Sequence, residues 1–109
     1  MAVPFPFIDR ATTRRRPALV LSTETFNRSH PAVLLAMITT ARSSDWASDV
    51  TIEDWQAAGL AVPCRVRFKL FTLDTTMIVG ALGQLSDNDK GRVATALQSV
   101  VALAGPERG

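Results

Sequence analysis

The chain has 109 residues, which suits one domain and leaves no room for a second. Apolar residues make up 47% of it, which excludes a disordered chain, and no run approaches the roughly 18 apolar residues of a membrane helix. The first residues do not combine a basic segment with an apolar stretch, so we expect no signal peptide. Cys64 is the only cysteine, which excludes an internal disulfide and is consistent with a reducing cytoplasm.

The net charge of +2 is mild, but it is unevenly distributed along the chain. Residues 1–44 carry a balance of +4, residues 45–64 a balance of −4, and residues 65–92 a balance of +2. Ten of the twelve cationic side chains are arginines, whose planar guanidinium binds phosphate or carboxylate at two points. The pattern therefore favours recognition of phosphate or carboxylate, although a GC-rich genome would produce the same arginine bias.

The first forty residues predict three strands. Val3 to Phe7 reads as a short edge strand because it contains two prolines. The basic loop from Ile8 to Arg15 leads into a buried strand from Pro17 to Ser22. Thr23 to Pro31 is polar and reads as a loop. Ala32 to Thr39 is apolar and short with polar flanks, which favours a third, buried strand over a helix.

The remaining residues predict a short helix and two further strands. After a polar loop, Thr51 resembles an N-cap, and Ile52 to Ala58 would form one or two helical turns that end at Gly59. Trp55 would then cover the core. Cys64 to Leu73 alternates apolar and cationic residues, which predicts a half-buried strand with a cationic outer face. Thr75 to Leu82 reads as another strand.

A C-terminal helix follows, capped by Ser86 and reaching Ala104. The connections are of the hairpin type and show no regular βαβ alternation. We therefore expect a small α+β protein, mainly β, with an antiparallel barrel or curled sheet and attached helices. The apolar face of the long helix would consist of Val93, Leu97, Val100, Val101 and Leu103.

Common catalytic and metal-binding patterns are absent from the sequence. One histidine and one cysteine cannot build a zinc site, and no carboxylate run has the spacing of a calcium loop. No glycine-rich phosphate loop is present. A hydrolase triad would have to use His30, which lies in a polar segment and reads better as a surface residue.

Arginines combined with hydroxyl groups remain as the available chemistry. Arg14, Arg15 and Arg16 end the first loop, Thr39 and Thr40 end the third strand, and Arg67 lies on the cationic strand. If these strand ends meet, they form a cationic concavity that suits a phosphodiester. RNA supplies its own nucleophile, the 2′-hydroxyl, so cleavage there needs no metal. The competing interpretation is that the arginines are solvated and that Thr39 caps a strand.

Four ordered segments resemble one family. "VPFPFIDRATTRRRPALVLS" (residues 3–22), "AMITT" (36–40), "IEDWQAAGLAVPCRVRFKLFTLD" (52–74) and "GALGQLSDNDKGRVATALQSVV" (80–101) are similar to the PemK/MazF-like toxins of type II toxin–antitoxin systems. The resemblance covers nearly the whole chain and implies a single domain, residues 1–109. Members usually have more residues before "VPFPF" than Met1 and Ala2, so we expect a shortened first strand.

The resemblance implies an SH3-like antiparallel barrel of the CcdB/PemK type, with a short helix and a C-terminal α-helix. It implies a cytoplasmic, metal-independent endoribonuclease that cleaves single-stranded RNA to a 2′,3′-cyclic phosphate and a 5′-hydroxyl, without a cofactor. It also implies a homodimer, a cognate antitoxin whose acidic tail covers the RNA groove, contact with DNA only through an antitoxin complex, and no membrane partner. The implied catalytic residues are Arg16, Thr39 and Arg67, and the implied RNA-binding residues are Arg10, Arg14, Arg15, Thr40 and Arg42.

Two other functions remain open. The chain could be an inactive or truncated toxin-like protein that sequesters antitoxin or binds another protein target such as gyrase. The gyrase-binding relatives have aromatic contacts at the extreme C-terminus, whereas this chain ends in "LAGPERG". Alternatively, the loop arginines pair only with the acidic segment, which contains Asp45, Asp49, Glu53 and Asp54.

Overall fold

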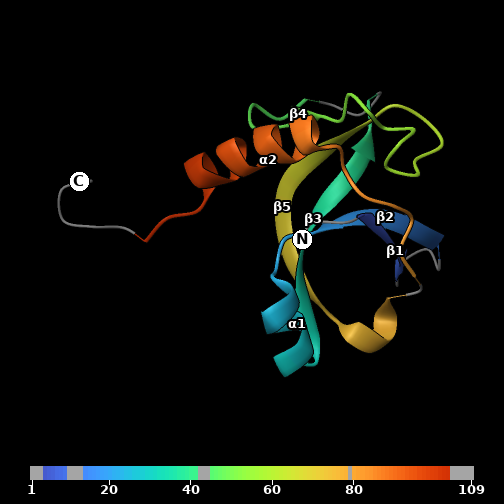
Figure 1. Cartoon of the computed structure of the whole chain (residues 1–109), viewed down its shortest axis with the longest axis vertical. Coiled ribbons are helices and arrows are strands. Elements are labelled where there is room, and N and C mark those ends of the chain that lie inside the picture. Colours follow the sequence, from blue (N-terminus) through green and yellow to red (C-terminus); the bar gives the residue numbers. More distant parts are fainter. Residues whose placement is uncertain (1–3, 10–13, 42–44, 79, 104–109) are drawn as a thin grey trace.

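The computed structural model describes residues 4–9, 14–41, 45–78 and 80–103, with the backbone alone for residues 4–9, 14 and 15. The described part consists of a five-stranded antiparallel sheet and two α-helices (Figure 1). The strands lie in the order β1-β2-β3-β5-β4, so β3 is central. The strands are β1 (Pro4–Asp9), β2 (Arg14–Val20), β3 (Ala32–Thr40), β4 (Val50–Thr51) and β5 (Cys64–Asp74), and the helices are α1 (Glu24–Ser29), a 3-10 helix (Thr75–Met77) and α2 (Asp87–Val100).

The expected fold class, mainly antiparallel β with a short helix and a C-terminal helix, is confirmed. The two helices lie at opposite ends of the sheet: α1 lies beside the start of β3, and α2 crosses the end near β4 (Figure 1). The strands expected at Val3 to Phe7, Pro17 to Ser22, Ala32 to Thr39 and Cys64 to Leu73 are all present, with ends that differ by a few residues.

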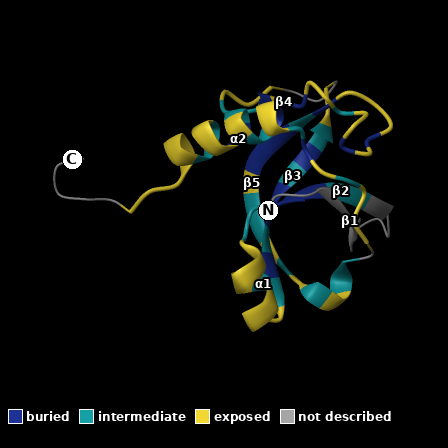
Figure 2. Ribbon diagram, viewed as in Figure 1, coloured by how far each residue is buried: buried dark blue, intermediate teal, exposed yellow. Residues whose placement is uncertain are grey.

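Side chains on both faces of β3 are buried, which explains its continuous apolar sequence (Figure 2). On one face, Ala36 and Ile38 join a large core cluster that also contains Val93 of α2. On the other face, Val33 and Leu35 join a smaller cluster with Ala18 and Val20 of β2. The second face is thus apolar near the start of β3, and it becomes polar where Thr39 follows.

An irregularity in the pairing of β3 with β5 lies beside this polar end. Ala36 pairs with Leu70, but the next residue, Met37, pairs with Arg67, so β5 has two extra residues there. Such a bulge bends the strand and increases its twist. The alternation of side chains continues through it, so Arg65 and Arg67 share the face of Met37 and Thr39.

The expectation of a loop from Thr23 to Pro31 was wrong, because residues 24–29 form α1. The Thr23 hydroxyl accepts a hydrogen bond from the Phe26 N–H, and Arg28 pairs with Glu24 one turn earlier. These are the usual signals of a helix start and of an exposed helical pair. The polar composition hid them.

The expected N-cap at Thr51 was also wrong, because Thr51 belongs to β4. Residues 53–59 form consecutive turns instead of a regular helix. The end of this segment at Gly59 is confirmed, because its φ of 84° is a conformation that glycine adopts without strain. Trp55 packs against the core, as expected.

The strand expected from Thr75 to Leu82 was wrong as well. The chain turns into the 3-10 helix there, and the Asp74 carboxylate accepts a hydrogen bond from the Thr76 N–H. This bond also lowers the pKa of Asp74 below its ordinary value of 3.8.

The predicted cap of the C-terminal helix is confirmed, because the Ser86 hydroxyl accepts a hydrogen bond from the Asp89 N–H at 3.1 Å. The helix ends at Val100, earlier than expected, and Ala104 lies outside the described residues. Val93 and Leu97 pack against the core. The rest of the expected apolar face is exposed, namely Val100, Val101 and Leu103.

Candidate functional site

The candidate site is a pocket at the place where β2 and β3 separate. The paired register of these strands ends at Ala18 and Met37, and continuing it by two residues brings Arg16 alongside Thr39. Both residues line one pocket with a volume of about 480 Å³. Its lining consists of Arg16, Pro17, Met37, Ile38, Thr39, Thr40, Gly59, Leu60, Ala61, Val62, Cys64 and Leu82.

This lining divides into a polar side and an apolar side. Arg16 is the cationic residue of the lining, and Thr39 and Thr40 are its hydroxyl-bearing residues. The apolar side is built mainly by the segment that follows the turns, including Leu60 and Val62. An anionic group with an attached flat, apolar group would match both sides of such a pocket.

The structure brings together some of the predicted site residues. Arg16, Thr39 and Thr40 meet at the pocket, whereas Arg67 is not part of its lining. Arg14 and Arg15 belong to β2, but their side chains are not described. Arg10 and Arg42 lie outside the described residues.

The expectation that Arg67 points outward into solvent was wrong. Its side chain lies on the predicted face of β5, but the loop before β4 covers it, and only 7% of the residue is exposed. Nε and Nη2 of Arg67 donate to the two carboxylate oxygens of Asp49, at 3.1 and 2.8 Å. The ring of Trp46 lies over the guanidinium, with 4.8 Å between its centroid and Cζ.

This ion pair changes the acidity of both partners. The hydrogen bond from Arg67 lowers the pKa of Asp49 below 3.8, and this effect outweighs the opposing effect of burial. The same hydrogen bond raises the pKa of Arg67. Both groups therefore remain charged at neutral pH.

Arg65 is a residue of this face that the sequence interpretation did not single out. It pairs directly with Thr39 across the β3–β5 ladder. Its guanidinium donates to Asp45 and to the carbonyl of Ala41, and it lies 3.6 Å from Asp49. The alternating pattern of β5 contained the signal, since Arg65 and Arg67 are two residues apart and must share a face.

The acidic segment therefore pairs with arginines that come later in the chain. Asp45 and Asp49 bind Arg65 and Arg67 of β5, and Glu53 lies 3.9 Å from Arg92 of α2. The partners that the described residues show for this segment belong to β5 and α2. The side chains of Arg10, Arg14 and Arg15 are not described, so pairing of this segment with the first loop stays a prediction.

Asp89 supports the turns that precede the apolar side of the pocket. Its side chain is fully buried and accepts hydrogen bonds from the N–H groups of Glu53 and Asp54, at 3.1 and 2.9 Å. Arg92 donates to the same carboxylate at 2.5 Å. Burial alone would raise the pKa of Asp89, but these hydrogen bonds outweigh it and lower the pKa below 3.8. Asp89 was not among the site residues that the sequence predicted.

The other chemically interesting side chains contribute little to the site. Cys64 lines the pocket but is buried, which raises the pKa of its thiol. His30 directly follows α1, at the opposite end of β3, and stacks on Phe26. Among the described residues, no three His, Cys, Asp or Glu side chains group closely enough to hold a metal ion. No helix within the described ranges has the length and apolarity to span a membrane.

Several solved structures of toxins and endoribonucleases have a similar fold. The Mycobacterium tuberculosis toxin MazF-mt6 superposes with a TM-score of 0.76 at 21% identity, covering 94% of this chain and 99% of that chain. A second M. tuberculosis toxin gives 0.73 at 22% identity, covering 90% and 99%. A mycobacterial endoribonuclease in complex with its cognate antitoxin gives 0.71 at 21% identity, covering 94% of each chain.

These likenesses establish the fold, and a family model establishes the relationship. A comparison with curated proteins gives no significant match. The model of the PemK-like, MazF-like toxins of type II toxin–antitoxin systems matches residues 2–101. The expected family is thereby confirmed: the chain belongs to the PemK-like, MazF-like toxins of type II toxin–antitoxin systems.

Proposed function

We propose that this protein is a single-domain toxin endoribonuclease that cleaves single-stranded RNA without a metal ion. The observation that carries the proposal is the meeting of Arg16 and Thr39, from two different strands, in one pocket of a toxin-family fold. Structural neighbours described as endoribonucleases support the choice of RNA.

In this reaction the 2′-oxygen of the RNA attacks the adjacent phosphorus. A P–O2′ bond forms, the P–O5′ bond breaks, and the proton lost from O2′ is balanced by a proton gained at O5′. The products are a 2′,3′-cyclic phosphate and a 5′-hydroxyl. Arg16 stabilises the negative charge that develops on the phosphoryl oxygens, and the hydroxyl of Thr39 holds a non-bridging oxygen.

The RNA strand needs further cationic and hydroxyl groups along its path. Arg10, Arg14, Arg15, Thr40 and Arg42 are the proposed strand-binding residues, of which Thr40 lines the pocket. Arg67 was expected to be catalytic, but we propose an indirect role for it, because its guanidinium already binds Asp49. We assign Arg67 to positioning the Asp49 loop beside the site.

The proposed partners follow from the family and its neighbours. A cognate antitoxin would neutralise the toxin by covering the cationic pocket with acidic residues, and any contact with DNA would occur through that complex. One neighbour is an endoribonuclease bound to its cognate antitoxin. We further propose a cytoplasmic homodimer.

A second candidate is a toxin-like protein that binds antitoxin without cleaving RNA. The burial of Arg67 favours it, because one of the two expected catalytic arginines is engaged by a carboxylate. The two candidates differ in one observable, which is the production of new RNA ends.

The test is incubation of the purified protein with a long, mixed-sequence RNA in excess EDTA, followed by mapping of the fragment ends. We expect discrete cuts with 5′-hydroxyl ends, and a loss of at least about 100-fold in rate for Arg16→Ala. Arg28→Ala is the matched control, because it removes an exposed arginine on α1 and should cut like the wild type. Intact RNA with folded wild-type protein would favour the antitoxin-binding candidate.

A further inference from the structure

Trp46 is an exposed aromatic residue in the loop between β3 and β4, and 43% of it is accessible. Large apolar side chains on a surface are common, but this one is held in place by specific contacts. Its N–H donates to Oδ2 of Asp49 at 3.0 Å, and its carbonyl accepts from the Asp49 N–H at 3.0 Å. The backbone of Trp46 is therefore fixed.

The ring of Trp46 is fixed as well. It lies over the guanidinium of Arg67, which Asp49 binds through two hydrogen bonds. The same aspartate thus orders both the tryptophan and the arginine that supports it. An aromatic surface ordered before binding loses little conformational entropy when a ligand arrives.

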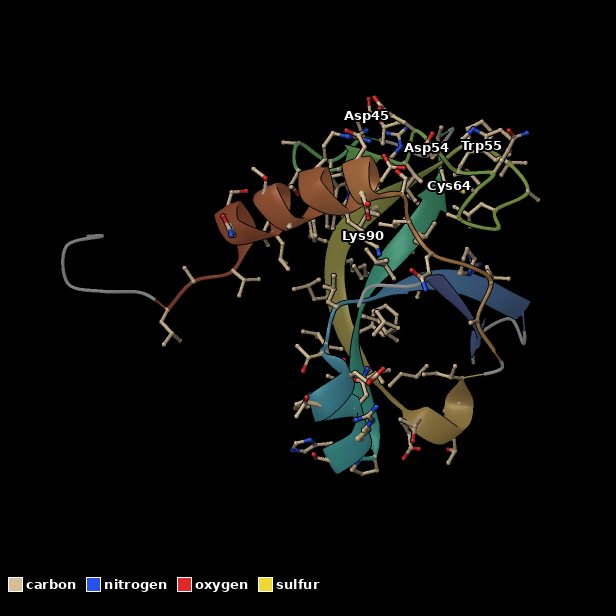
Figure 3. The ribbon with its side chains drawn as sticks, viewed as in Figure 1. Asp45, Asp54, Trp55, Cys64 and Lys90 are labelled. Atoms are coloured by element: carbon tan, nitrogen blue, oxygen red, sulfur yellow. The ribbon has the colours of Figure 1, made fainter. Side chains whose placement is uncertain are left out.

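The location relates Trp46 to the pocket. Arg67 pairs with Met37, a residue of the pocket lining, and Met37 precedes Thr39 on the same face of β3 by two residues, about 7 Å. Asp45, the neighbour of Trp46, lies with Cys64 at this end of the molecule (Figure 3). The exposed ring therefore belongs to the same face and the same end as the proposed cleavage site.

The electrostatics decide what kind of contact this ring can make. The arginines beneath and beside it, Arg67 and Arg65, are paired with Asp49 and Asp45. The patch is therefore close to neutral and is poorly suited to phosphate. A flat apolar surface next to a phosphate site suits a nucleobase, which stacks on tryptophan whatever its sequence.

We propose that Trp46 is the platform on which a nucleobase next to the scissile phosphate stacks, which makes it a binding and specificity-determining residue. The inference rests on the proposed ribonuclease function. Arg67 and Asp49 are the positioning residues of this platform. The ligand is single-stranded RNA, and the contact is stacking rather than charge pairing.

The test measures affinity for a 2′-O-methyl RNA, which binds but lacks the nucleophile and cannot be cut. Trp46→Leu keeps an apolar cover over Arg67 but removes the aromatic face, and it should weaken binding by about 5- to 150-fold. Trp46→Phe should restore most of the affinity. The slope of log affinity against log salt should stay unchanged, because no phosphate contact is lost.

Phe26→Ala is the matched control. Phe26 is 40% exposed, similar to Trp46, but it lies on α1 beside the start of β3. Its loss should leave RNA affinity unchanged. Circular dichroism of each variant confirms that the fold persists, and a variant that unfolds is replaced in the comparison by Trp46→Phe and Trp46→Met.

A second measurement locates the base. Replacing single nucleotides near the cut by abasic sites should weaken wild-type binding most at one position, and Trp46→Leu should be insensitive to that substitution. Equal affinity of Trp46→Leu and the wild type would overturn the platform while leaving the nuclease intact. If the wild type neither binds nor cuts RNA, both proposals fail, and the exposed ring is assigned to a protein partner.

Discussion

At the scale of single residues, the pocket depends on two side chains that lie 23 positions apart in the sequence, Arg16 and Thr39. General preferences explain each residue type separately, because arginine suits phosphate binding and threonine is favoured in strands. Their proximity depends on the register of β2 against β3. A shift of this register by one residue would turn one of the two side chains to the opposite face.

The contribution of the Thr39 hydroxyl can be separated from that of the side-chain shape. Thr39→Val keeps the β-branched volume but removes the hydroxyl, and we expect about a 100-fold lower single-turnover cleavage rate because a phosphoryl contact is lost. Thr39→Ser, which retains the hydroxyl, should stay within about tenfold of the wild type. Thr72→Val, at an exposed position of β5, is the control. A Thr39→Val enzyme as fast as the wild type would remove the hydroxyl from the mechanism.

At the scale of elements, the turns of residues 53–59 lead into the segment that lines the apolar side of the pocket, and two contacts fix these turns. Asp89 of α2 accepts hydrogen bonds from their first N–H groups. At their end, Gly59 adopts a positive φ and lies against the backbone of Leu82. These turns are thus attached to α2 at their start and to the segment before α2 at their end.

Substitution of Gly59 tests this second contact. A Cβ atom there would lie 2.4 Å from the Leu82 carbonyl oxygen, at a backbone conformation that alanine rarely adopts. We expect Gly59→Ala to lower the free energy of unfolding, measured by urea denaturation, by about 2 kcal/mol or more.

Gly91→Ala is the matched control for the same chemical change. Gly91 lies in α2, and a Cβ atom there would meet nothing within 4 Å. The substitution should raise the free energy of unfolding by about 0.5–1 kcal/mol, because alanine has the better helix propensity. Similar effects of the two substitutions would show that the contact between Gly59 and Leu82 does not matter for stability.

At the scale of the whole molecule, three carboxylates make the fold sensitive to acid. The pKa values of Asp49, Asp74 and Asp89 all lie below the ordinary value of 3.8. The unfolded chain therefore binds protons at a higher pH than the native state does. Their contribution to stability is complete above about pH 5 and decreases as the pH falls through about 4 toward the lower native values.

The acid sensitivity can be tested at one of these carboxylates by comparing the stability of Asp49→Asn with that of the wild type. The variant leaves the buried guanidinium of Arg67 without its carboxylate, so its free energy of unfolding should be lower than that of the wild type at pH 7. The difference should shrink as the pH falls below about 5 toward the lowered native pKa of Asp49, because protonation of Asp49 removes its charge in the wild type as well.

Glu24→Gln is the control for this titration, because it removes an exposed carboxylate on α1 that pairs with Arg28. An exposed pair contributes little, so this variant should follow the wild type across the titration. Parallel pH profiles for Asp49→Asn and the wild type would contradict a native-state pKa shift at Asp49.

The sequence by itself determined the features that depend on local composition and pattern. The apolar runs fixed the positions of β2 and β3, the alternation of apolar and cationic residues fixed the two faces of β5, and Ser86 marked the start of α2. Ordered motifs along the chain carried the family, which the match over residues 2–101 confirms. Short helical signals were lost wherever polar composition resembled a loop, as at α1.

Only the tertiary structure decided which charges meet. The pattern of β5 placed Arg65 and Arg67 on one face, but the loop that folds over that face provides Asp45, Trp46 and Asp49. The burial of Asp89 beneath the turns of residues 53–59 likewise joins residues 35 or more positions apart. Ion pairs and stacking depend on distances of a few ångströms between segments remote in sequence, and the packing of the whole chain sets those distances.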